Sequence, residues 1–353
     1  MQAKTLSAVL TVYNLSECLN ETLTSLERQS YSPKELLIID DGSTDGSENI
    51  IKSYLAKNPN WKFIKTANNG VSRARNIGLR QSTGDYIIFL DGDDIFHSDF
   101  FLYMMEATEG KPQIVVCRSK EMDDVSKLSI PLWWSIRKRY LPKNKLFNTE
   151  ELSGSIFYTF MGWPWDKLFL REHLVSNELY FPDLNNSEDL VLVYAALVFS
   201  NRISIVDREL IYHRVNRKTS ISMNVNKDPL CVLRAIKLLK SILLTRKECY
   251  KREEQSFTEW SCDLALWGAR QIQSPKDCHI KGYQEQIMNV LPLISSVRKP
   301  LFFPVLDRRI KSFINSRRNR DNDLLYAFAF CKKFGVKRLL FRLFSSIFLK
   351  IRF

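Results

Sequence analysis

The chain has no long uncharged apolar run. Nowhere in its 353 residues do about 18 such residues follow one another, so we expect no transmembrane helix. Near the start only Leu6 to Val12 is apolar, without a small-residue cleavage pattern behind it, which predicts that there is no signal peptide. The seven cysteines are odd in number and show no CxxC spacing. This pattern argues against a disulfide framework and predicts reduced thiols in a cytoplasmic protein.

Acidic residues are scarce in the last third of the chain. Residues 1–224 contain 26 Lys/Arg and 28 Asp/Glu, a net charge of −2, which leaves 26 and 11, net +15, for residues 225–353. Such a concentration of positive charge predicts an anionic partner, either a membrane surface or nucleic acid. The length exceeds that of one typical domain. We therefore expect a first domain over residues 1–224 and a basic, mainly helical region over residues 225–353.

Short apolar runs alternate with amphipathic segments in the first hundred residues. Strands separated by helices of about ten to fifteen residues imply right-handed crossovers and a largely parallel sheet. The pattern therefore predicts an α/β fold. The expected strands are 6–12, 35–39, 61–66 and 86–90, the expected helices are 15–29, 48–57 and 71–81, and two further strands are expected at 202–206 and 209–214.

Two of the expected strands end in acidic residues. Asp91, Asp93 and Asp94 follow residues 86–90, and Asp41 follows residues 35–39. Closely spaced carboxylates repel one another unless a cation lies between them. Carboxylate oxygens suit Mg²⁺ or Mn²⁺, and a substrate phosphate often completes the shell of such an ion. This edge of the sheet is therefore a candidate metal and nucleotide site, the alternative being solvated acidic turns.

Four short segments of the first hundred residues stand in a characteristic order and spacing. They are Thr11-Val12-Tyr13-Asn14, residues 39–45, residues 69–79 and the Asp-x-Asp motif with its neighbour, Asp91 to Asp94. Together they resemble the family-2 inverting glycosyltransferases of bacterial cell-surface polysaccharide synthesis, which have the GT-A fold, a Rossmann-like, mostly parallel sheet flanked by helices. The resemblance covers roughly residues 5–105 strongly and extends more loosely to about residue 222. It implies metal-dependent transfer of a sugar from a UDP-sugar.

The resemblance assigns roles on the donor side. Tyr13 would stack on uracil with Thr11 beside it, and Asp41 would accept the imide N–H. Arg75 would neutralise the diphosphate. The alternatives are a tyrosine at the sheet edge and an exposed arginine on a helix.

The Asp-x-Asp motif receives two roles from the resemblance. Asp93 would hold Mn²⁺ or Mg²⁺, while Asp91 would reach the nucleotide sugar. Asp94 would help to hold these two residues in place without itself binding the metal or the sugar.

The acceptor side of the site is expected around Trp163-Pro164-Trp165-Asp166. The family has a similar segment there, and aromatic walls suit the C–H faces of sugars. The alternative is a buried tryptophan pair. Trp133 and Trp134, beside a basic run, indicate either a loop over the site or an element that dips into a membrane.

The catalytic base is expected at the start of a helix over residues 188–199. Ser187 is a candidate cap, and Glu188 and Asp189 stand in the first turn, where the helix dipole favours carboxylates. That placement has a purely structural explanation. The resemblance instead makes Asp189 the base that takes the proton of the acceptor hydroxyl, with Glu188 on the acceptor side.

The segment Tyr212 to Ser222 resembles a family segment whose basic residues approach the diphosphate. His213 and Arg217 are the candidates here, and a solvated basic loop is the alternative. The Gln-x-x-Arg-Trp signature of processive relatives is absent, which favours the addition of a single sugar.

The basic tail has no family motif. Val336, Leu340, Leu343, Ile347 and Ile351 recur at helical spacing among Lys, Arg and Phe residues. Such a helix suits the surface of an anionic bilayer. Together with the family resemblance, this tail predicts a cytoplasmic enzyme, peripheral on the inner face of the cell membrane, with a glycan or lipid-linked acceptor. A solvated basic face or an oligomer contact is the alternative for the tail.

Two other function classes remain alternatives for this sequence. One is a protein that binds nucleotide sugars without turnover. The other is a nucleic-acid-binding protein using the basic region, which lacks a recognisable recognition module, so no nucleic acid is expected.

Overall fold

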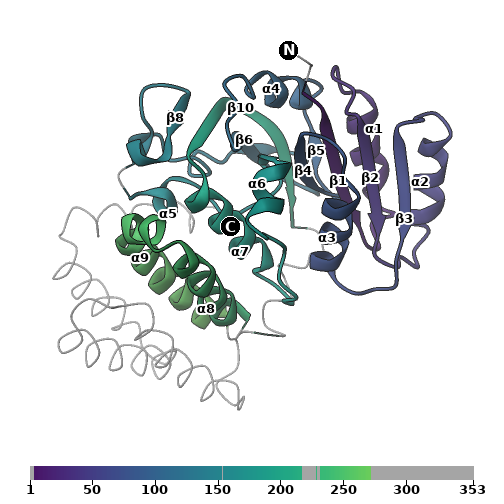
Figure 1. Ribbon diagram of the computed structural model, residues 1–353. Coiled ribbons are helices and arrows are strands. Elements are labelled where there is room, and N and C mark those ends of the chain that lie inside the picture. Colours follow the sequence, from purple (N-terminus) through teal and green to yellow (C-terminus); the bar gives the residue numbers. More distant parts are fainter. Residues whose placement is uncertain (1–3, 153, 217–227, 229–230, 272–353) are drawn as a thin grey trace. The chain divides into compact units, whose positions relative to one another are not determined.

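The computed structural model describes residues 4–152, 154–216, 228 and 231–271. In these residues one ten-stranded sheet has the order β3-β2-β1-β4-β9-β6-β10-β5, with β7 paired to β6 and β8 paired to β10 (Figure 1). The strands are β1 (Leu6–Val12), β2 (Glu35–Asp40), β3 (Trp61–Lys65), β4 (Tyr86–Asp91), β5 (Ile95–Phe96), β6 (Ile114–Asp123), β7 (Ser129–Pro131), β8 (Leu146–Asn148), β9 (Lys167–Leu170) and β10 (Arg202–Val215).

The first half of the sheet is parallel. β1 pairs with β2 and β4, and β2 pairs with β3, all in parallel. Every residue of β1 and β2 is buried, as expected of strands covered on both faces. The crossovers are α1 (Leu19–Glu27), α2 (Ser47–Leu55) and α3 (Val71–Gln81). This half confirms the predicted α/β architecture.

The second half of the sheet is mixed. β9 runs antiparallel between β4 and β6, and β10 runs parallel to β6 but antiparallel to β5. The two strands expected at 202–206 and 209–214 are a single strand, β10, whose register against β6 shifts between Val206 and Ile211. Because β5 directly follows the Asp91 to Asp94 turn, its pairing with Ile211 and Tyr212 brings the end of β10 to that turn.

Helices of the second half cover the sheet and one another. They are α4 (Phe100–Glu106), α5 (Ile156–Thr159), α6 (Arg171–Ser176), α7 (Glu188–Phe199), α8 (Cys231–Leu243) and α9 (Lys247–Gln271). α8 packs on α7, and α9 packs on α5 and α8, so α8 and α9 belong to the compact unit that contains the sheet. Ser187 does not cap α7 as expected. It adopts a left-handed conformation (φ 62°), and its hydroxyl donates to Asn186 Oδ1.

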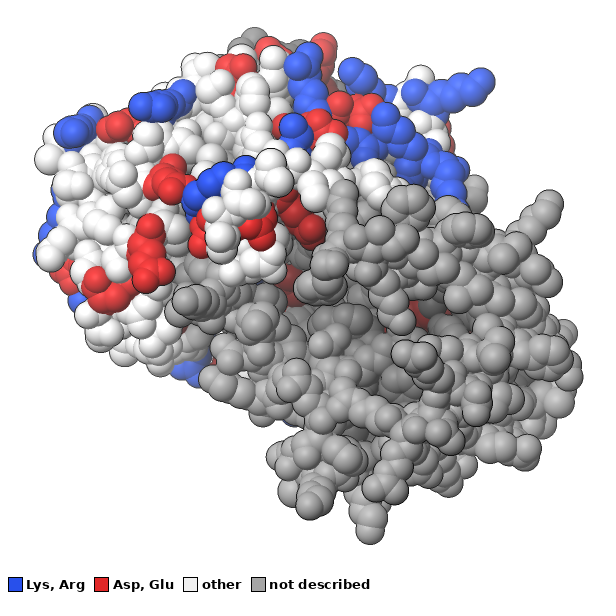
Figure 2. Space-filling model, turned by 180° about the vertical axis from the view of Figure 1, so that it is seen from behind, with Lys and Arg blue, Asp and Glu red and all other residues white. Residues whose placement is uncertain are grey.

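Several expectations for the C-terminal region lie outside the described residues. The expected domain boundary at residue 224 and the helix of residues 336–351 are both among them. The part of this region that is described, residues 231–271, is helical. No helix in the described part of the chain is long and apolar enough to cross a membrane. On the face in Figure 2, the described basic and acidic side chains are interspersed.

Candidate active site

Asp41 lies at the carboxyl end of β2 with its carboxylate held in place. Its Oδ1 accepts from Asn69 N and Thr66 Oγ1, both at 3.0 Å, and its Oδ2 accepts from Gly70 N at 2.8 Å. Gly70 has φ 90°, a conformation that favours glycine and turns the chain into α3. A carboxylate has about four acceptor positions, so one remains for a further N–H donor. This arrangement suits the role expected of Asp41.

Tyr13 follows β1 at the same edge of the sheet. Its side chain is 42% exposed, whereas Thr11 is buried beside Asp91 in the register of β1 and β4. Asn14 has φ 50° and accepts from Thr44 N at 2.8 Å, which ties the turn after β1 to the turn after β2. An aromatic face is therefore available to solvent next to the Asp41 turn.

Arg75 joins two carboxylates that are far apart in the sequence. From α3 its Nη2 donates to Asp91 Oδ1 and its Nη1 donates to Glu188 Oε1, each at 2.8 Å, and the guanidinium also stacks over Phe181. Burial alone would lower the pKa of Arg75, but the charges of Asp91 and Glu188 outweigh burial and raise it. Arg75 was expected at the diphosphate. In this structure its two terminal nitrogens are engaged by protein carboxylates, so it connects β4 to the start of α7.

Asp189 follows Glu188 in the first turn of α7. Its Oδ1 accepts from Leu190 N at 2.8 Å. Burial and then the charge of Glu188 raise the pKa of Asp189 to about 7, although Arg75 opposes the shift. A carboxylate that exchanges its proton near neutral pH is well matched to general-base catalysis.

The turn after β4 is compact and closely held. Gly92 N donates to Thr11 O at 3.1 Å, and a Cβ on Gly92 would lie 2.7 Å from that same carbonyl oxygen. The Asp94 side chain is buried, and its Oδ1 accepts from His213 Nδ1 at 2.9 Å and from Arg214 N at 3.0 Å. Asp94 therefore joins the turn to β10.

The expected acceptor residues form an aromatic stack. Trp163 lies on Trp165 with ring centroids 4.7 Å apart, and Trp165 lies on His213 at 4.9 Å. Trp163 is partly exposed, whereas Trp165 is 3% exposed. Burial lowers the pKa of His213, but Asp94 and the other acids of the turn raise it to about 9. His213 is thus a cation beneath the stack and beside the Asp91 to Asp94 turn.

Asp166 lies inside the protein behind the aromatic stack. It is 0% exposed and pairs with Lys167 Nζ at 2.5 Å, and that nitrogen also donates to Trp163 O at 2.9 Å. Burial raises the pKa of Asp166 to about 6, against the effect of Lys167. Asp166 therefore supports the backbone of the tryptophan segment in this structure. Arg217 lies outside the described residues.

A metal ion at this site would need ligands from a substrate as well as from the protein. Among the described residues, no three or more His, Cys, Asp or Glu side chains gather as a metal-binding group. Asp91 and Asp93 are partly exposed carboxylates at one strand end. Mg²⁺ and similar ions are usually bound by one or two carboxylates plus substrate phosphates. These residues fit such an ion when a diphosphate completes its shell.

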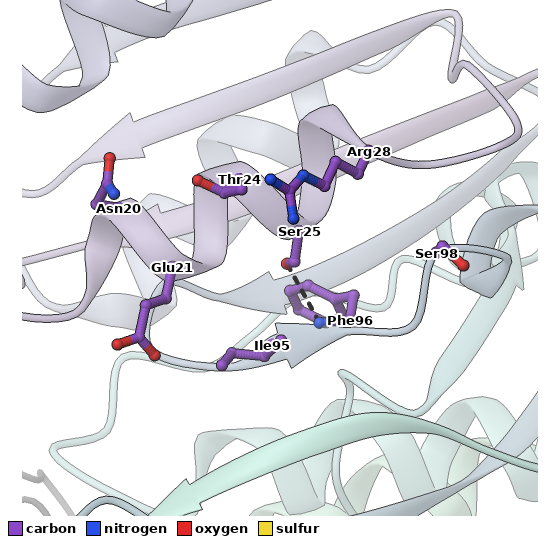
Figure 3. A pocket seen from close by; sticks show the side chains of 8 residues that line it. All are labelled: Asn20, Glu21, Thr24, Ser25, Arg28, Ile95, Phe96 and Ser98. Carbon is purple, nitrogen blue, oxygen red and sulfur yellow. Dashed lines mark hydrogen bonds between the residues drawn. The ribbon is translucent and has the colours of Figure 1, made fainter. Parts of the chain in front are cut away.

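A separate pocket lies between α1 and β5, and Figure 3 shows the side chains that line it. Ser25 Oγ accepts from Phe96 N at 3.2 Å at its floor. None of the residues discussed above lines it. Its lining residues are Asn20, Glu21, Thr24, Ser25, Arg28, Ile95, Phe96 and Ser98.

The fold and these carboxylates define a GT-A-type α/β domain with acids at the carboxyl ends of β2 and β4. Residues 7–163 match the family model described as "Glycosyl transferase family 2". Over these residues, which are less than half of the chain, the protein is similar to that family.

Individual relatives show the same similarity. The chain is 27% identical over 221 residues to "Putative glycosyltransferase EpsH" of Bacillus subtilis (strain 168), covering 61% of this chain and 62% of that protein. It is 30% identical over 212 residues to "Uncharacterized glycosyltransferase EpsJ" of the same organism, covering 60% and 61%. The match thus spans about three fifths of each relative. The structure of S. aureus TarS 1-349 in complex with UDP-GlcNAc has a TM-score of 0.55 at 19% identity, over 82% of this chain and 90% of that one, and shares the fold.

Arg214, whose backbone N–H donates to Asp94 Oδ1, is a residue of the site that the sequence does not single out. Within the segment Tyr212 to Ser222, the resemblance indicates His213 and Arg217. Similarity to a basic family segment does not say which group each side chain contacts.

Proposed function

We propose that the protein is a metal-dependent inverting glycosyltransferase. It moves one hexosyl or N-acetylhexosaminyl group from a UDP-sugar to a hydroxyl of a glycan acceptor in surface polysaccharide synthesis. The observation that carries this proposal is the bridge of Arg75 between Asp91 and Glu188. It brings the start of α7, with Asp189, to the strand end that bears the Asp-x-Asp motif.

The donor would be bound by the turns after β1, β2 and β4. Tyr13 offers a face for uracil, Thr11 lies beside it, and Asp41 accepts the imide N–H. Asp91 would face the ribose and sugar, and Asp93 would hold Mn²⁺ or Mg²⁺, which would supply positive charge to the leaving diphosphate. His213 and Arg217 would approach the diphosphate. The complex of TarS with UDP-GlcNAc supports a UDP-sugar donor.

The acceptor would enter from the side of the tryptophans and α7. Trp163 contacts the sugar face, Trp165 and Asp166 support it, and Glu188 stays paired to Arg75. Asp189 takes the proton of the attacking hydroxyl as the oxygen bonds to the anomeric carbon and the bond to the diphosphate breaks. Attack on the face opposite the leaving group inverts the configuration at that carbon.

The acceptor would be lipid-linked, and the enzyme would work at the inner face of the cell membrane. Residues 1–224 would form the nucleotide-sugar-binding and catalytic domain, against which α8 and α9 pack, and the rest of the basic region 225–353 would contact anionic lipids. The net charge of +15 in that region supports this arrangement.

Calorimetric titration of the full chain with UDP, with and without Mn²⁺, tests the donor site. We expect UDP binding that Mn²⁺ strengthens, and we expect Asp93→Asn to remove that gain. Asp99→Asn, a partly exposed acid beyond the turn, is the control and should retain it. Equal UDP binding with and without Mn²⁺ would contradict a metal-assisted site.

Turnover is tested by UDP release from a panel of UDP-sugars mixed with lipid-linked saccharides. Release that depends on the acceptor is expected for at least one pair. UDP binding without release from any pair would favour a nucleotide-sugar-binding protein without turnover.

A further inference from the structure

Arg214 is buried where β10 reaches the turn after β4. Its side chain is 1% exposed, and it has partners in three parts of the chain. Nε donates to Asp93 O at 2.7 Å, Nη2 donates to Glu21 Oε2 of α1 at 2.8 Å, and Nη1 donates to Asp124, just beyond β6. The backbone N–H of Arg214 adds a bond to Asp94 Oδ1 at 3.0 Å. One residue thus holds both the carbonyl of Asp93 and the side chain of Asp94.

The charged side chains around Arg214 hold its guanidinium in this position. Hydrogen bonding to Arg214 lowers the pKa of Glu21 against the effect of burial, and it lowers the pKa of Asp124 in the same way. Lys127 Nζ lies 3.6 Å from Glu21 and 3.2 Å from Asp124, so the two carboxylates are further neutralised. A planar guanidinium presents its donors in a fixed fork, which suits three acceptors in different directions.

The geometry points to Arg214 as a positioning residue for Asp93, the carboxylate that would hold the metal in the proposed function on which this inference rests. The bond to the carbonyl of Asp93 fixes the peptide from which that side chain projects. Glu21 and Asp124 fix the guanidinium in turn. Arg214 therefore does not act on the diphosphate, the role that the family resemblance gives to basic residues of this segment, because its nitrogens face the turn, α1 and the segment after β6.

Removing a residue that hydrogen-bonds to a metal ligand typically weakens metal affinity by about 10- to 100-fold. We therefore expect Arg214→Gln to weaken Mn²⁺ binding at saturating UDP by about tenfold or more. Arg214→Lys keeps the charge but offers a compact ammonium, so it should recover only part of the loss. UDP binding without metal should stay within about twofold of the wild type, since Tyr13 and Asp41 do not contact Arg214.

The experiment measures Mn²⁺ binding to the full-length protein in the presence of UDP, from the loss of the paramagnetic resonance signal of the free ion. Calorimetry with UDP in the absence of metal is the second readout. The matched control is Arg118→Gln, because Arg118 is a buried arginine of β6 whose guanidinium pairs with Asp207 rather than with the turn after β4. It should leave Mn²⁺ binding unchanged.

Glu21→Gln tests the same contacts if the Arg214 variants do not fold. It removes the charge of a half-exposed partner and leaves the guanidinium in place, so a smaller loss of Mn²⁺ affinity, about two- to fivefold, is expected. Unchanged Mn²⁺ affinity in folded Arg214→Gln, or unchanged affinity in Glu21→Gln when Arg214→Gln does not fold, would overturn the inference. So would a loss confined to metal-free UDP binding. A wild-type protein that binds no Mn²⁺ with UDP would remove the proposed function and this inference with it.

Discussion

Arg75 Nη1 lies 2.8 Å from Glu188 Oε1, a contact between residues 113 positions apart. The same guanidinium holds Asp91. The donor strand end and the helix of the candidate base are therefore joined through one buried cation. Removing it leaves carboxylates near one another without their counter-charge, which is costly for side chains that are largely buried.

Arg75→Met tests this connection. Loss of one partner of a buried ion pair typically costs about 3–5 kcal/mol, so we expect the free energy of unfolding to fall by about that amount. Urea denaturation followed by circular dichroism measures it. Arg73→Met is the control on the same helix, since Arg73 and its partner Asp183 are both well exposed, and it should change stability by less than about 1 kcal/mol. Equal stability of the two variants would show that the bridge contributes little.

The raised pKa of Asp189 predicts a pH dependence of stability. The folded protein holds a proton on Asp189 up to a pKa of about 7, whereas the unfolded chain releases it near pH 4. The contribution of this group is therefore fully present below about pH 4 and is lost as pH rises through about 7. Asp189→Asn should remove this loss and be more stable than the wild type at pH 8. Glu172→Gln, an exposed acid in the first turn of α6, should leave the pH profile unchanged.

The same residue should set the pH dependence of transfer. As the base, Asp189 must be unprotonated, so kcat/KM, which reports the free enzyme, is expected to rise as pH increases through about 7. Asp189→Asn should fold and bind UDP normally but lower kcat by about 10²- to 10⁴-fold. Steady-state kinetics across pH, with UDP affinity measured alongside, checks this. Retained turnover in the variant would remove Asp189 from the mechanism.

Tyr13→Ala tests the stacking surface. The side chain is 42% exposed, so its loss should leave the melting temperature nearly unchanged. Aromatic stacking on a base contributes about 1–3 kcal/mol, which corresponds to a roughly 5- to 150-fold loss of UDP affinity. Tyr180→Ala removes a similarly exposed tyrosine that contacts Arg80 on α3, and it should bind UDP like the wild type. Similar UDP affinities for both variants would argue against the assignment of Tyr13.

Gly92→Ala tests the tightness of the turn after β4. The added Cβ would lie 2.7 Å from Thr11 O, so backbone must shift, and overpacking of this kind costs about 1–3 kcal/mol. Mn²⁺ binding with UDP should weaken as well. Gly84→Ala makes an equally close contact, 2.6 Å from Ser7 N, at the other end of β4. It should destabilise the protein without changing Mn²⁺ affinity, so parallel effects in both variants would contradict a special role of the turn.

The local sequence pattern was sufficient to predict the first half of the fold. The expected strand at residues 6–12 and helix at 71–81 have the bounds found in the structure, because their periodicity and turn residues are encoded within a few positions. The second half depended on pairing between distant strands. The antiparallel insertion of β9 between β4 and β6 and the joining of residues 202–215 into one strand have no local signature.

The residue types and spacings alone determined the alternation of strands and helices and the clustering of acids at two strand ends, because both follow from short-range chemistry. Only the tertiary structure decided that Arg75 faces Glu188, that Asp166 turns inward to Lys167, and that Arg214 holds the carbonyl of Asp93. Where a long side chain finds its partners depends on which strands pair and how deeply it is buried, and those are properties of the folded chain as a whole.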